Sequence, residues 1–136
     1  MKHLEMRAML FTSLMVATSM AQADPCDHID RRLTSERKSE LARSLAGQLD
    51  ARTIDVLQSY RSGAWTIVYV DTHEADPAFL FFAGDPLKSH YIALWSGAAR
   101  LDEEQVILDW TNKNVPRIPA PLAQCFAWHV SKSRDM

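Results

Sequence analysis

The sequence predicts a single α+β domain: an N-terminal helix, a four-stranded antiparallel β-meander, a second helix, and a C-terminal segment of uncertain type tied back by a disulfide. Three observations predict it. Leucines at helical spacing open the domain, four short apolar runs with brief polar links follow, and two cysteines lie near its ends. Because parallel strands need long crossover connections, the short links favour antiparallel pairing between neighbours.

Residues 1–23 have the pattern of a signal peptide that is cleaved during export. Lys2 and Arg7 make a positive start, residues 8–18 are mostly apolar, and Ala21-Gln22-Ala23 is a small-x-small cleavage pattern. The apolar run is too short for a membrane span, which needs roughly 20 apolar residues. We therefore expect a periplasmic or secreted protein of one domain, residues 24–136, with no membrane span after cleavage.

Two cysteines remain in that domain, Cys26 and Cys125. An even number of cysteines in an oxidising compartment favours a disulfide. Closing a loop of about 100 residues contributes up to about 4.7 kcal/mol in the chain-entropy model. The alternative is two separate buried thiols.

The first helix is predicted over residues 33–49. Thr34 is a suitable N-cap, and Gly47 and Asp50 mark the end. One apolar stripe faces the core, made of Leu41, Leu45 and Leu49. The basic residues in and before this helix alternate with acidic ones, so we interpret them as a face exposed to water.

Four strands are predicted after the helix, over residues 54–60, 65–70, 79–82 and 90–95. In the first, Ile54, Val56 and Tyr60 fall on alternate positions, with Gln58 interrupting the pattern. A turn containing Gly63 joins the first two strands as a hairpin. The second and fourth strands are apolar on both sides, so both faces of the sheet should be covered. Either the chain's own helices cover both, or a partner covers one of them.

The second helix carries a capping box and a hydrophobic staple. Asp102 is the expected N-cap with Gln105 as its reciprocal partner, and Leu101 and Val106 have the staple spacing. The inward face is predicted to contain Val106, Ile107 and Trp110, and the helix should end near Asn114. Residues 122–130 fit a helix and a strand about equally, with a slight preference for the helix.

The loop that follows the second strand holds the densest cluster of ionisable side chains: Asp71, His73, Glu74 and Asp76. Carboxylates beside a histidine suit metal binding or acid–base chemistry, although the spacing matches no zinc signature. A water-facing hairpin loop is the simpler interpretation. The meander places this loop at one end of the sheet, away from His90. The neighbours expected there are Arg52, Ser96, Arg100, Asp102 and Glu103.

Four aromatic side chains form a second candidate binding surface: Trp65, Tyr69, Tyr91 and Trp95. They are suited to lining a ligand pocket, but the same pattern is typical of a core.

The composition narrows the function without naming it. The formal charge is −2 for the whole chain, and the balance stays weakly acidic without the leader. Nucleic acid is therefore not an expected partner, because its phosphates need clustered positive charge. No cofactor motif is found, so no cofactor is expected. The leading hypothesis is a non-enzymatic module that binds or inhibits another envelope protein. The alternatives are a small metal-binding protein or hydrolase using Asp71, His73 and Asp76, and a structural envelope protein that self-associates.

Overall fold

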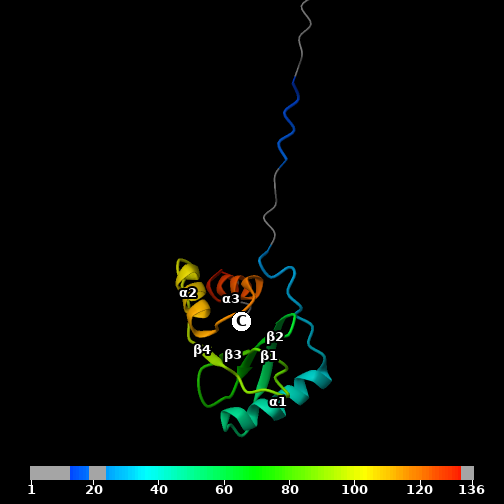
Figure 1. The fold of residues 1–136 in the computed structure, drawn as a ribbon, viewed down its shortest axis with the longest axis vertical. Coiled ribbons are helices and arrows are strands. Elements are labelled where there is room, and N and C mark those ends of the chain that lie inside the picture. The colour runs from blue at the N-terminus through cyan, green and yellow to red at the C-terminus, as the bar shows by residue number, and fades with distance from the viewer. Residues whose placement is uncertain (1–12, 19–23, 133–136) are drawn as a thin grey trace, which may run out of the picture.

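A computed structural model describes residues 13–18 and 24–132. Its elements are, in chain order, α1 (Ser35–Leu49), β1 (Asp55–Ser62), β2 (Trp65–Asp71), β3 (Ala78–Phe82), β4 (Ala93–Ser96), α2 (Glu104–Asn114) and α3 (Ala120–Lys132). The strands form one antiparallel sheet in the order β1-β2-β3-β4 (Figure 1). The α+β meander is confirmed, and the uncertain tail is a helix.

The expected signal peptide lies outside the described residues except for 13–18, which form no helix or strand. Its cleavage stays a prediction. None of the helices in the described ranges has the length and apolar character needed to cross a bilayer.

Helix α1 begins and ends where the sequence indicates. Thr34 is the N-cap, and its side chain accepts a hydrogen bond from the backbone N–H of Arg37 at 3.1 Å. Asp50 closes the helix in the left-handed conformation, with a φ of 51°. Leu41 and Leu45 are buried against the sheet, which confirms the predicted apolar stripe.

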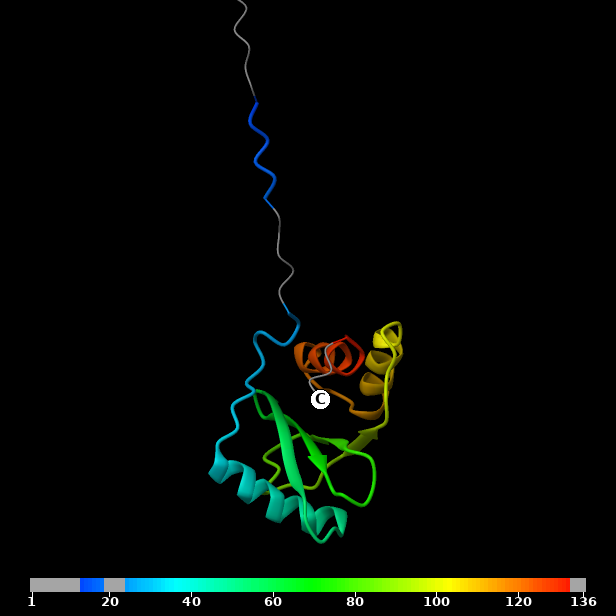
Figure 2. The same cartoon turned by 180° about the vertical axis from the view of Figure 1, so that it is seen from behind.

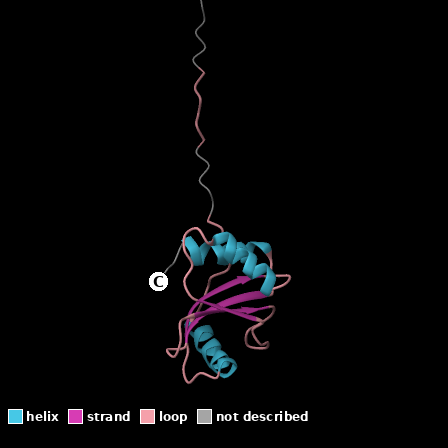
Figure 3. Cartoon of the chain, turned by 90° about the vertical axis from the view of Figure 1, so that its left-hand side faces the viewer, coloured by secondary structure: helices cyan, strands magenta, loops and turns pink. Residues whose placement is uncertain are grey.

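The sheet is covered on both faces by the chain's own helices. Figure 3 shows α1 below the strands and α2 with α3 above them. Leu80 and Phe82 of β3 belong to the core between the sheet and α1, called here the core under α1. Phe79 and Phe81 belong to the core between the sheet and the helices α2 and α3, called the core under α2 and α3. Because successive side chains of a strand point to opposite faces, a strand between two layers is apolar throughout. Of the two alternatives, the chain's own helices cover both faces of β3, whereas the α1 side of β4 stays partly exposed at Leu94.

A β-bulge changes the predicted pattern of β1. Val56 is opposite Val70 and Gln58 is opposite Tyr69, so Leu57 is an extra residue on β1. Val56 consequently packs on the α1 side and Tyr60 on the α3 side. Their even spacing in the sequence therefore does not place them on one face, because a bulge shifts the alternation by one residue.

The Cys26–Cys125 disulfide is present, with the two Cα atoms 4.7 Å apart. Both cysteines are buried. Figure 2 shows the segment before α1 running from beside α3 to the start of α1. Along the way, Asp30 and Arg61 exchange two backbone hydrogen bonds, of 3.0 and 2.8 Å. The disulfide and this bridge hold the segment against the domain.

The predicted start of the second helix is wrong. Helix α2 begins at Glu104, and no side chain caps it. Asp102 lies 3.4 Å from Arg100, and Gln105 donates to Asp109 at 2.8 Å. Val106 is 63% exposed, so it is not part of the inward face.

The face of α2 that contacts the core follows a four-residue spacing instead. Ile107, Thr111 and Val115 are buried in turn. Thr111 is compatible with burial because its hydroxyl donates to the carbonyl of Ile107 at 2.8 Å. A pattern based on apolar residues passes over a threonine and selects Val106.

Strand β4 is shorter than predicted, because residues 90–92 lie outside it. The side chain of Gln48 on α1 explains the difference. Its Nε2 donates to the carbonyls of Ser89 at 2.9 Å and Pro86 at 3.3 Å, and its Oε1 accepts from the N–H of Tyr91 at 3.0 Å. The backbone at Pro86, Ser89 and Tyr91 is therefore bonded to α1, whereas the N–H of Ile92 still donates to the carbonyl of Phe81 on β3 at 2.8 Å.

Replacing both Cys26 and Cys125 with alanine should lower the free energy of unfolding by about 3–5 kcal/mol, because the open chain gains conformational freedom when unfolded. Urea denaturation with and without reductant measures this. The wild type should lose stability on reduction, and the double variant should be insensitive to reductant. Equal midpoints for the oxidised wild type and the variant would contradict the expectation.

Ile107→Ala and Val106→Ala compare adjacent residues of α2 that differ in burial. Ile107→Ala should destabilise by about 2–4 kcal/mol, because it leaves a cavity in the core. Val106→Ala should change the stability by less than about 0.5 kcal/mol. Thermal unfolding of both variants measures the difference, and the opposite ranking would restore the inward face predicted from the sequence.

Candidate functional site

The imidazole of His73 lies between two carboxylates. Its Nε2 is 2.7 Å from Oδ2 of Asp55, and its Nδ1 is 3.5 Å from Oδ2 of Asp71. Asp55 and Asp71 are directly opposite each other on β1 and β2. Like charges in opposite positions repel, and the His73 imidazole lies between these two carboxylates. The backbone N–H of His73 also donates to the carboxylate of Asp71, and the backbone φ of His73 is 62°.

The sequence identified Asp71 and His73 but missed Asp55, which only the register of the β1–β2 hairpin could have supplied. The other predicted neighbours interact elsewhere. Arg100 lies 2.9 Å from Glu103 and 3.4 Å from Asp102. Glu74 and Asp76 are exposed on the same loop as His73. The structure places no hydrogen bond or ion pair between His73 and any of these five residues.

Across residues 13–18 and 24–132, no group of three or more histidine, cysteine, aspartate or glutamate side chains has an arrangement that could hold a metal ion.

The four candidate aromatic residues lie in two different layers. Trp65, Tyr69 and Trp95 pack against the core under α2 and α3, and Tyr91 packs against the core under α1. The Tyr69 ring stacks on Phe79 at 4.1 Å, and the Trp95 ring is 5.6 Å from Phe126. All four are half-buried packing residues, so they do not line one shared pocket.

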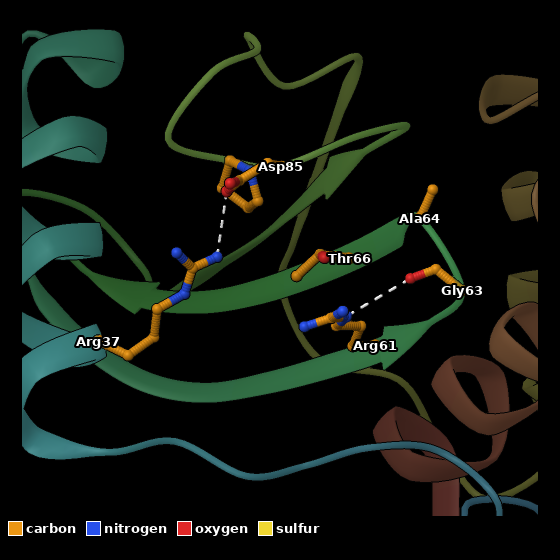
Figure 4. A pocket seen from close by; sticks show the side chains of 7 residues that line it. Arg37, Arg61, Gly63, Ala64, Thr66 and Asp85 are labelled. Carbon is orange, nitrogen blue, oxygen red and sulfur yellow. Dashed lines mark hydrogen bonds and ion pairs between the residues drawn. The ribbon is translucent and has the colours of Figure 1, made fainter.

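A groove that sequence reasoning missed lies at the N-terminal end of α1. Its volume is about 530 Å³. Figure 4 shows its lining, which combines α1, the β1–β2 hairpin and the β3–β4 connection: Arg37, Arg61, Gly63, Ala64, Thr66, Asp85 and Pro86. An adjoining hollow of about 280 Å³ shares Arg37, Arg61 and Thr66 and adds Asp30, Arg32, Thr34 and Ser59.

The hairpin register and the first turn of α1 create this groove. Arg61 is directly opposite Thr66. The hairpin turns at Gly63, whose φ of 59° suits a residue without a Cβ. Arg37 extends from α1 across the groove to Asp85, 3.1 Å away.

The charges of the groove are partly paired. The N–H of Leu87 and the guanidinium of Arg37 hold the pKa of Asp85 below its ordinary value, with the backbone bond as the larger cause. Hydrogen bonds from the side chain and backbone of Arg32 lower the pKa of Asp30 in the same way. The Nε of Arg61 donates to the carbonyl of Gly63 at 3.4 Å. No carboxylate of the described residues forms an ion pair with Arg61.

The basic residues around the first helix are exposed as expected, apart from Arg37, which is only partly exposed. It is half-buried and pairs with a residue 48 positions away. Charge alternation reports only neighbours in sequence, so it could not reveal a partner on a distant loop.

The pH dependence of the stability of Asp85→Asn tests the contacts of the Asp85 carboxylate with the N–H of Leu87 and the guanidinium of Arg37. Because the folded pKa is lowered, the carboxylate adds stability above the ordinary carboxyl range, and this stability is lost as the pH falls through the folded value. The free energy of unfolding of the wild type should therefore exceed that of the variant most at about pH 6, by under about 1 kcal/mol. This difference in stability should shrink below about pH 4. Urea denaturation across this range measures it, and a difference that does not vary with pH would contradict the assignment.

Compared with protein-family models, curated proteins and solved structures, the chain has no match in any of the three. Its function is therefore argued from the geometry of its own residues.

Proposed function

We propose that the chain is an exported, non-enzymatic module that binds another protein of the periplasm or the extracellular space through the outer edge of β4. Among residues 13–18 and 24–132, this strand pairs only with β3, on one side. Along the outer edge, alternate residues direct their N–H and C=O groups away from the sheet. Such an edge is a template for an extended segment of a partner, which adds to the sheet as a further strand.

The observation that carries the proposal is that α1 does not cover the side of β4 that faces the α1 layer. Leu80 on β3 is fully buried, but Leu94, directly opposite it on β4, is 40% exposed. Ile92, which precedes the strand, is 47% exposed. An added strand would bring side chains over Leu94 and would continue the core under α1, so part of the affinity would come from apolar burial.

The other edge of the sheet is less open to pairing. Strand β1 contains the bulge at Leu57, and the segment before α1 bonds to it at Arg61. Bulges and covering segments are features by which proteins block unwanted pairing at an edge. The difference between the two edges favours β4 as the binding surface.

The rigid frame supports a binding role. Pairing with β3 and the packing of Trp95 against Phe79 and Phe126 hold β4 in place, so binding would cost little further conformational entropy. The alternative of a metal site or hydrolase at residues 71–76 has weaker support, because Asp76 makes no hydrogen bond or ion pair with His73. Self-association, the other alternative, would use the same edge and is distinguished by the experiment.

Leu94→Lys should weaken capture of the partner, while Leu57→Lys should preserve it. The control is matched, because Leu57 lies on the opposite edge strand and is 42% exposed. A lysine that loses water at the interface without an anionic partner should weaken binding by about tenfold or more. Immobilised wild type and both variants are exposed to periplasmic extract, and stoichiometric bound proteins are quantified.

Light scattering of the purified wild type over a range of concentrations covers the remaining outcome. If the measured mass rises with concentration and Leu94→Lys removes this rise, the occupant of the β4 edge is a second copy of the chain and not another protein. Capture that both lysine variants reduce equally, or no stoichiometric capture by folded wild type, would overturn the proposal.

A further inference from the structure

Thr66 places a hydroxyl group in the wall of the groove. Its side chain is only 6% exposed, and it lines the groove between Arg37 and Arg61 (Figure 4). Within the part of the chain that the structure describes, its hydroxyl makes no hydrogen bond. The hydroxyl is therefore free to donate a hydrogen bond to a group bound in the groove.

Two guanidinium groups flank this hydroxyl. Arg61 has no ion pair with a described carboxylate, and its only side-chain hydrogen bond uses Nε. Its two terminal nitrogens are therefore free to donate to a ligand. Arg37 uses Nη2 to contact Asp85 and retains further N–H donors. Arginine presents a planar fork of donors that matches the oxygens of a phosphate or carboxylate.

The start of α1 adds positive potential beside the two arginines. Thr34 caps the helix and lines the adjoining hollow. The N–H groups of Ser35 and Glu36 make no hydrogen bond among the described residues. The N-terminus of a 15-residue helix carries about half a positive charge and favours an anion.

We propose that this groove binds the phosphate group of a phosphorylated small molecule or lipid headgroup. Donors reach it from α1, from Arg61 and from Thr66, and a tetrahedral group can accept from several sides at once. The three arginines of the two adjoining hollows outnumber the aspartates Asp30 and Asp85, so the lining is positive. The volume exceeds that of phosphate alone and lies within the range of small-molecule sites. The site is separate from the β4 edge, so either proposal can fail without the other.

Amide NMR spectra of the ¹⁵N-labelled protein, titrated with inorganic phosphate at constant ionic strength, test the proposal. Saturable shifts are expected at Arg37, Arg61 and Thr66, which line the groove. Arg61→Gln should weaken binding by about tenfold, through loss of a charge-assisted contact. Thr66→Val, which keeps the shape of the side chain, should weaken it by about threefold. The matched control is Arg52→Gln, an exposed arginine after the C-terminal end of α1, and it should bind as the wild type does.

Asp85→Asn provides a change in the opposite direction, which a misfolded variant would not produce. Asparagine keeps an oxygen for the N–H of Leu87 and removes the competing negative charge, so phosphate should bind about threefold more tightly. A second arm uses phosphatidylcholine vesicles with and without phosphatidic acid. Binding to the phosphatidic acid vesicles alone, lost in Arg61→Gln, would support the site and identify a lipid headgroup as the source.

Three results would overturn the proposal. One is the absence of saturable binding to both probes. Another is an equal loss in Arg61→Gln and Arg52→Gln, which would indicate general attraction to positive charge. The third is weaker binding in Asp85→Asn.

Discussion

The burial of β3 on both faces is the constraint on which the other elements depend. Phe79 and Phe81 need a cover on one side, and Leu80 and Phe82 need one on the other. Neither α1 alone nor the pair α2 and α3 could satisfy both. The chain therefore places its helices before and after the sheet, one group on each side. The exposure of Leu94 follows from the same arrangement, because α1 does not cover the strand farthest from β1.

Contacts between residues far apart in the sequence position the groove at the N-terminal end of α1. The disulfide joins the N-terminal segment to α3, and the Asp30–Arg61 bridge directs this segment along β1 toward α1. Arg37 is thereby brought opposite Asp85, a residue of the β3–β4 connection. The groove consequently combines three parts of the chain that are far apart in sequence, and its shape depends on the whole fold.

The sequence predicted features that depend on neighbours along the chain and missed those that depend on neighbours in space. The Thr34 cap and the leucine stripe of α1 need only local spacing, and both are confirmed. The disulfide could be predicted because only one intramolecular pair is possible. By contrast, a bulge at Leu57 leaves no local signature, although it decides which face Tyr60 occupies. The contact of Asp55 with His73 and the groove around Thr66 both depend on the hairpin register.

Gln48 holds residues 86–91 through backbone groups alone, donating to two carbonyls and accepting from one N–H. Hydrogen bonds to backbone groups do not depend on which side chains the bonded residues carry. The connection should therefore tolerate wide variation in most of its side chains over evolutionary time while keeping its path. The glutamine itself has no equivalent freedom, since even glutamate would lack the donor that two of the three contacts require.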